Sequence, residues 1–104
     1  MPKILTKISF SPQGVQTLLN RGVDGFEQRL QEVAESLGLT FEHHWFAFGE
    51  TDLYAVADAP DNATAAAAAL RSAASPNIAS VETVILLSSD EMRIALEKTA
   101  HAPG

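Results

Sequence analysis

Four stretches of the chain are rich in β-branched and aromatic residues and largely alternate between apolar and polar positions, which predicts four β-strands. They are Lys3–Phe10, residues 39–48, Leu53–Asp58 and residues 78–87. The first has one side more apolar than the other, formed by Ile4, Thr6, Ile8 and Phe10. The last strand is apolar on both sides, as expected of a strand that is covered on both faces.

Apolar residues at helical spacing predict helices in the connections between these strands and in the segment after the last strand. Ser11 followed by Pro12 predicts a helix start, and Gly22 its exit. A second segment over residues 24–37 continues the same connection, beginning with a capping-box spacing at Asp24 and Glu27 and ending at Gly38. An alanine-rich helix over residues 62–74 follows the corner at Pro60, with Asp61 or Asn62 as its cap, and a last capping box lies at Ser88 and Glu91.

The last helix has a narrow apolar stripe, formed by Met92, Ala95, Leu96 and Thr99. The element order is strand, helix, strand, strand, helix, strand, with this C-terminal helix added. It predicts an α+β, ferredoxin-like βαββαβ fold with a four-stranded antiparallel sheet, built as one domain over residues 1–104.

Two main helices cover only one face of such a sheet, although its strands carry apolar residues on both. The simplest way to cover the second face is to pack it on another copy, so we expect a homodimer in which two sheets meet around a shared interior. Such a pairing often leaves a pocket between the sheet and its helices or loops.

Composition narrows the class of partner. The net charge is −6 and the seven basic residues are scattered, which argues against nucleic acid as a ligand. The chain has no cysteine, so it has no disulfide, thiolate metal site or Cys nucleophile, and no cluster has metal-ligand spacing. No apolar run is long enough for a signal peptide or a membrane span, and we expect a cytoplasmic protein.

His43 and His44 are the first candidates for chemistry. Adjacent strand residues point to opposite faces, so the two cannot chelate one ion together. His43 is expected on the side of Phe41 and Trp45, and His44 on the side of Glu42 and Phe46. Either fits general acid/base work, or axial haem ligation if a cofactor is present, and the alternative is one solvated histidine and one that is hydrogen-bonded at a dimer seam. No cofactor is otherwise predicted.

Asp52 and Tyr54 form a second candidate set, two residues apart on one side of the third strand. With a histidine from the neighbouring strand they would surround a small aromatic or carbonyl substrate. In the alternative, Asp52 caps the hairpin turn and Tyr54 fills the interface. Trp45 is either a stacking surface for a ligand or an interface residue.

Several segments together resemble a known family. They are FSPQGV at residues 10–15, ESLG at residues 35–38 and GETDLYAVADAPDN at residues 49–62. They are similar to the GYD domain family of small bacterial and archaeal proteins, over nearly the whole chain. The resemblance implies a ferredoxin-like fold similar to the dimeric α+β barrels, and it implies no particular activity. Thr51 stands where that family usually has tyrosine, so a site served by the tyrosine would be altered here.

Three functions remain open at this point. A homodimeric module that binds a small apolar or aromatic ligand is favoured, because no motif supplies a strong nucleophile. The alternatives are a cofactor-independent monooxygenase or isomerase, with His43 or His44 as base and Tyr54 as donor, and a purely structural assembly unit. Fold analogy alone does not choose among them.

Overall fold

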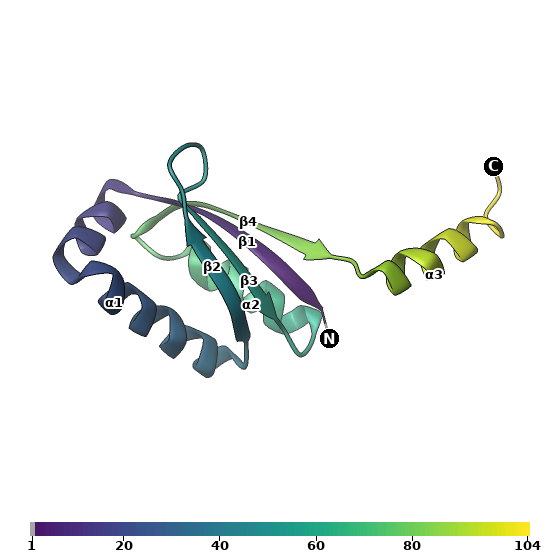
Figure 1. Ribbon diagram of the computed structural model, residues 1–104, viewed down its shortest axis with the longest axis horizontal. Helices are drawn as coiled ribbons and strands as arrows, with labels where there is room; N and C mark the ends of the chain where they lie inside the picture. Colours follow the sequence, from purple (N-terminus) through teal and green to yellow (C-terminus); the bar gives the residue numbers. More distant parts are fainter. Residues whose placement is uncertain (1) are drawn as a thin grey trace.

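The structure is a computed structural model that describes residues 2–104. It contains seven helices and strands, in the predicted order (Figure 1). They are β1 (Lys3–Phe10), α1 (Pro12–Leu37), β2 (Thr40–Phe46), β3 (Leu53–Asp58), α2 (Asn62–Ala73), β4 (Ile78–Leu86) and α3 (Ser89–Thr99). The ferredoxin-like α+β fold with an added C-terminal helix is therefore confirmed.

The four strands form one antiparallel sheet in the order β2-β3-β1-β4. β1 lies in the centre, pairing Ile4 with Ala57 of β3 on one side and with Ile85 of β4 on the other. Since side chains alternate along a strand, Ile4 and its register partners face one way, and Leu5 with its partners Val56 and Val84 faces the other.

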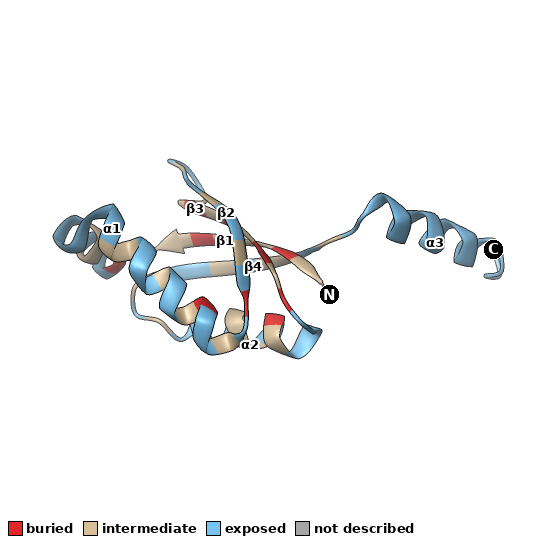
Figure 2. Ribbon diagram, turned by 60° about the horizontal axis from the view of Figure 1, so that its bottom comes forward, coloured by how far each residue is buried: buried red, intermediate tan, exposed pale blue. Residues whose placement is uncertain are grey.

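Helices α1 and α2 pack on the face that carries Ile4, here called the covered face (Figure 2). The buried core lies between this face and the two helices and is rich in alanine, with Ile4 and Leu53 as its largest fully buried side chains. The small side chains of Ala57, Ala59 and Ala65 bring α2 close to the sheet. The opposite face, called the open face, carries no helix in the described chain.

The two predicted helical segments before β2 form one helix with a kink. Gly22 lies at the kink with φ 75° and ψ −178°, a backbone conformation found almost only in glycine. The second segment turns Phe26 onto the covered face, where its ring centroid lies 6.0 Å from that of Phe10 and 5.3 Å from that of Phe46. The break predicted at Gly22 is thus confirmed as a kink that positions Phe26.

The start of α1 is fixed on the loop before β4. Ser11 caps the helix, accepting a hydrogen bond from the Gly14 amide, and its own backbone N–H donates to the carbonyl oxygen of Asn77 over 3.1 Å. Gly14 is buried against that same carbonyl, where a Cβ atom would meet the oxygen far inside contact distance. Glycine at this position is therefore a requirement of packing.

Strand β2 differs from the prediction in length and in phase. It covers seven residues rather than ten, because Ala47 already belongs to the loop before β3. A β-bulge between Phe41 and His43 adds Glu42 as an extra residue, so Phe41 pairs with Ala57 and packs against the core while His43 pairs with Val56. The expectation that Phe41 shares a face with His43 is wrong for this reason.

Helix α3 extends away from the rest of the chain (Figures 1 and 2). Its start is the predicted capping box, in which Ser88 accepts from the Glu91 amide and the Glu91 carboxylate accepts from the Ser88 amide. All eleven of its residues are exposed.

Candidate ligand-binding pocket on the open face

The open face has an apolar middle with charged pairs on either side. The middle row is formed by Leu5 with its partners Val56 and Val84. At one end Lys3 pairs with Glu42 and lies 3.3 Å from the Asp58 carboxylate. At the other end the Lys7 ammonium lies 3.4 Å from the Glu82 carboxylate. Both lysines are paired with carboxylates here, which lowers the cost of covering this face relative to unpaired charges.

The pair at Lys3 joins the bulge of β2 to the central strand. The hydrogen bond from Lys3 to Glu42, opposed by partial desolvation and aided by Asp58, raises the pKa of Lys3 above its ordinary value. Lys3 therefore stays charged throughout the neutral range, and its role is to hold β1, β2 and β3 together at this edge.

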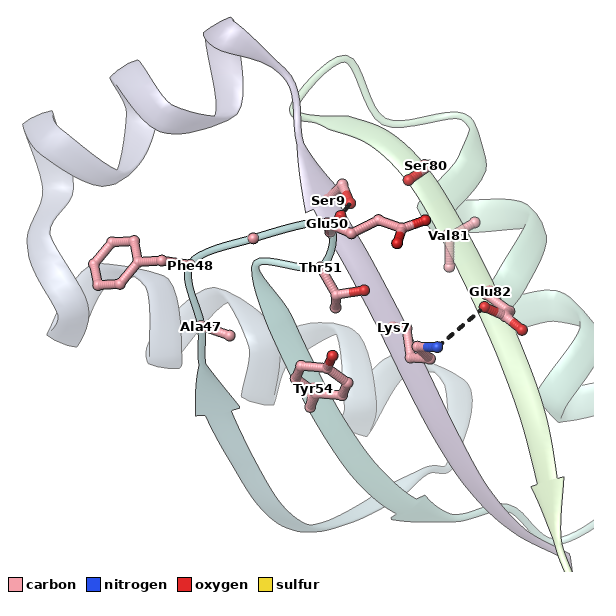
Figure 3. A pocket seen from close by; sticks show the side chains of 11 residues that line it. Lys7, Ser9, Ala47, Phe48, Glu50, Thr51, Tyr54, Ser80, Val81 and Glu82 are labelled. Carbon is pink, nitrogen blue, oxygen red and sulfur yellow. Dashed lines mark hydrogen bonds and ion pairs between the residues drawn. The ribbon is translucent and has the colours of Figure 1, made fainter.

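A pocket of about 420 Å³ lies at the Lys7 end, beneath the loop between β2 and β3 (Figure 3). We call it the loop pocket. Tyr54 and Lys7 stand on its floor and Thr51 points into it from the loop (Figure 3). The full lining is Lys7, Ser9, Ala47, Phe48, Gly49, Glu50, Thr51, Tyr54, Ser80, Val81 and Glu82. Its volume falls within the range of about 300–1,000 Å³ typical of small-molecule pockets.

The loop over the pocket is tied to β1 by hydrogen bonds. The Asp52 carboxylate accepts from the Phe10 amide over 2.9 Å, and the Asp52 amide donates to the Ile8 carbonyl over 2.9 Å. The Ser9 hydroxyl donates to the carbonyl of Glu50. Asp52 is thus bound to the backbone of β1 and holds the loop in place. The polar side chains that remain in the pocket lining are those of Lys7, Glu50, Thr51, Tyr54, Ser80 and Glu82.

Trp45 and His43 lie on the open face beside the pocket. Trp45 pairs directly with Tyr54 across β2 and β3 and is 55% exposed. The ring of His43 is centred 5.7 Å from that of Trp45. Three of the predicted site residues therefore gather at one end of the sheet, with Tyr54 in the pocket, Trp45 beside it and Asp52 holding the loop. His43 lies next to Trp45, level with the middle row at Val56.

His44 lies on the covered face, away from the pocket. Its Nε2 is 2.9 Å from the Glu27 carboxylate of α1, and its ring packs edge-on against Phe46 with centroids 5.9 Å apart. Glu27 thus connects α1 to β2 through its contact with His44. The capping box predicted for Asp24 and Glu27 does not form, because both residues lie inside helix α1. The sheet separates His44 from Tyr54, so only His43 can act with the pocket residues.

Sequence reasoning missed Lys7, Glu82 and Ser9 as pocket residues. The signal that could have found them is the antiparallel register, since Lys7 stands opposite both Tyr54 and Glu82. Thr51 was singled out only through the family resemblance, and it lies in the pocket lining.

The fold and this face define a class of protein, the small ferredoxin-like α+β domain with one sheet face left open and a loop-covered pocket on that face. Within this class, the model of the GYD domain matches residues 5–96, and the chain belongs to the GYD domain family. Neither a curated protein nor a solved structure matches the chain. Within residues 2–104, no helix is long and apolar enough to cross a membrane.

Proposed function

We propose that the protein is a homodimeric module that binds one small ligand in the loop pocket of each subunit. The observation that carries this proposal is that the pocket opens on the same sheet face that the helices leave open. Pairing of two open faces would shield the pocket from water, and binding sites are typically concave and protected in this way. A regulatory role follows if the ligand changes the stability of the dimer.

The apolar middle row supports pairing through this face. Leu5, Val56 and Val84 are only half-buried in the single chain, and Trp45 is mostly exposed. Two antiparallel sheets pack face to face at about 10 Å, which places such rows in contact. The charged pairs at both ends lie where an interface has its polar rim.

The pocket lining indicates the chemistry of the ligand. Tyr54 offers a ring surface inside the pocket and Trp45 offers another beside it, while Lys7, Thr51 and the Tyr54 hydroxyl offer hydrogen bonds. A small aromatic molecule with one polar substituent fits both sets of groups. A wholly apolar ligand would leave the hydroxyl groups of Thr51 and Tyr54 facing apolar surface, which costs free energy.

Native mass spectrometry of the freshly purified protein tests this proposal. We expect a dimer whose mass exceeds twice the denatured chain mass by that of one small molecule per subunit. Thr51→Trp fills the pocket and should yield a dimer without the added mass. Gln28→Trp, which places the same side chain on the exposed surface of α1, is the control and should retain it.

The emission of Trp45, the single tryptophan, gives a second measurement on the same protein. We expect added phenols or aromatic carboxylates to change it in the wild type and not in a Tyr54→Phe, Lys7→Met double variant. A bare wild-type dimer whose Trp45 emission responds to none of these compounds would contradict the binding role.

A catalytic role is the second candidate, because His43 shares the open face with Tyr54. In a cofactor-independent monooxygenase or isomerase, His43 would act as base and Tyr54 as hydrogen-bond donor. His44 is not available for this role, since it contacts Glu27 on the covered face. If His43 is a catalytic base, the His43→Ala variant should lose turnover while it still binds the ligand. If the protein is a binding module, the same variant should lose neither stability nor dimerisation.

A further inference from the structure

Helix α3 has an apolar stripe without a surface to pack on. Met92, Ala95, Leu96 and Thr99 follow one another at helical spacing on one side of the helix, and Met92 and Leu96 are 46% and 61% exposed. Isolated helices shorter than about 12–15 residues are marginal in water. A helix of eleven residues with a complete capping box therefore needs a surface that stabilises it.

A groove on the covered face has the matching shape. It runs between α2 and β4, has a volume of about 370 Å³ and is lined by Asn62, Ala65, Ala66, Ala69, Thr83 and Ile85. Ile85 is 49% exposed, although it points to the side of the sheet that the helices cover. The three alanines allow another helix to approach α2 closely, because their side chains are small.

We propose that the groove between α2 and β4 of one chain receives α3 of a second copy, and that the two copies exchange these helices reciprocally. Only Leu87 and Ser88 connect β4 to α3, and the helix runs outward from the end of the strand, away from α2 and the sheet (Figures 1 and 2). It extends about 16 Å beyond the sheet at 1.5 Å per residue, which is enough to reach a neighbouring subunit.

The helix α3 and the groove between α2 and β4 complement each other, which indicates a second copy of the chain as the partner that fills the groove. The chain supplies both an exposed apolar helix and an exposed apolar groove, and exchange about a two-fold axis covers both at once. Leu87 is exposed and lies two residues after Ile85. It therefore extends the apolar surface from the groove towards α3. This exchange does not depend on a ligand in the loop pocket.

Chemical cross-linking between two variants tests the exchange, because the chain has no cysteine and introduced thiols are the only ones present. Leu96→Cys is placed on the stripe of α3, and Ala66→Cys in the groove. The two full-length variants are prepared separately, one of them isotopically labelled, mixed to allow subunit exchange and treated with a short bismaleimide. The control replaces Leu96→Cys by Lys98→Cys, which lies on the opposite side of α3 at 100° per residue.

We expect a mixed species that contains one labelled and one unlabelled chain, formed about tenfold faster from Leu96→Cys than from Lys98→Cys, because docking raises the effective concentration of the two thiols. Equal rates for the two pairs would overturn the proposal. So would a chain carrying both Leu96→Cys and Ala66→Cys that links only within itself at a concentration where the protein is a dimer, since α3 would then occupy its own groove.

Discussion

His43 and His44 are neighbours in the sequence with different surroundings. His44 packs against Phe46 and contacts Glu27, whereas His43 is exposed beside Trp45. We expect His44→Ala to lower the free energy of unfolding by about 1–2 kcal/mol, because it removes the aromatic contact with Phe46 and the contact with the Glu27 carboxylate. His43→Ala is the matched control and should change it by less than about 0.5 kcal/mol. Chemical denaturation measures both, and equal losses would contradict the assignment of the two faces.

Asp61 connects the pH dependence of stability to the start of α2. Its carboxylate accepts hydrogen bonds from the side chain and the amide of Thr64, which lower the pKa of Asp61 below its ordinary value. The charged form is thus favoured in the folded state. Its contribution to stability is complete above about pH 4 and is lost as the pH falls through the lowered value.

Two substitutions separate the cap from the charge. Asp61→Asn still caps the helix but does not titrate, so we expect its melting temperature to fall less than that of the wild type between about pH 5 and pH 2. Asp61→Ala removes the cap as well and should melt lower at every pH. Thermal melting followed by circular dichroism measures this, and parallel curves for the wild type and Asp61→Asn would refute it.

Local signals in the sequence predicted some residues and not others. The caps at Ser11 and Ser88 and the kink at Gly22 follow from short-range spacing, which the sequence displays directly. The bulge at Glu42 has no such signal, because it arises from pairing with a distant strand, and it changed the side on which Phe41 lies. The contact of His44 with Glu27 likewise depends on how α1 packs after its kink.

At the scale of elements, the contact between α1 and the loop before β4 fixes the first crossover. Gly14→Ala would force its new methyl group against the carbonyl oxygen of Asn77, which also accepts the Ser11 amide. We expect a loss of about 1–3 kcal/mol in the free energy of unfolding, as for overpacking in a core. Gln13→Ala changes the exposed neighbouring position and serves as control. Urea denaturation that leaves Gly14→Ala as stable as Gln13→Ala would show that the loop moves aside without cost.

Helix α3 gives a prediction about assembly rather than about folding of the chain. Met92→Asp combined with Leu96→Asp should leave the far-ultraviolet spectrum of the body unchanged, since neither side chain is buried in it. If the helices are exchanged, the dissociation constant of the dimer rises about tenfold or more, which corresponds to roughly 1.4 kcal/mol. Glu97→Ala with Lys98→Ala is the control on the other side of the helix. An unchanged dissociation constant would count against a role for α3 in assembly.

The sequence predicted the order and type of every element and the uncovered sheet face, because strand and helix periodicities and helix caps are local. It did not predict that α3 would lie away from the body, since its apolar stripe is equally consistent with packing on its own sheet. It also left the loop pocket unassigned, because Lys7, Tyr54 and Glu82 meet only through the register of three strands.

At the scale of the whole molecule, the open face links the pocket to assembly. Leu5, Val56 and Val84 form its apolar row, and Trp45 and Tyr54 connect that row to the pocket. If two such faces meet, a ligand held beside Tyr54 lies next to the interface and would stabilise the dimer by mass action.

Sedimentation velocity of the wild-type protein at micromolar concentration tests the central claim, that the open face pairs two copies, most directly. We predict a dimer for the wild type. For Val84→Glu, which places a charge in the apolar row, we predict a folded protein whose dimer has a dissociation constant about tenfold higher or more. Lys98→Glu, an exposed change of charge on the side of α3 away from its stripe, is the control and should remain a dimer. A wild-type protein that sediments as a monomer would contradict the pairing of the open faces and the proposed function that depends on it.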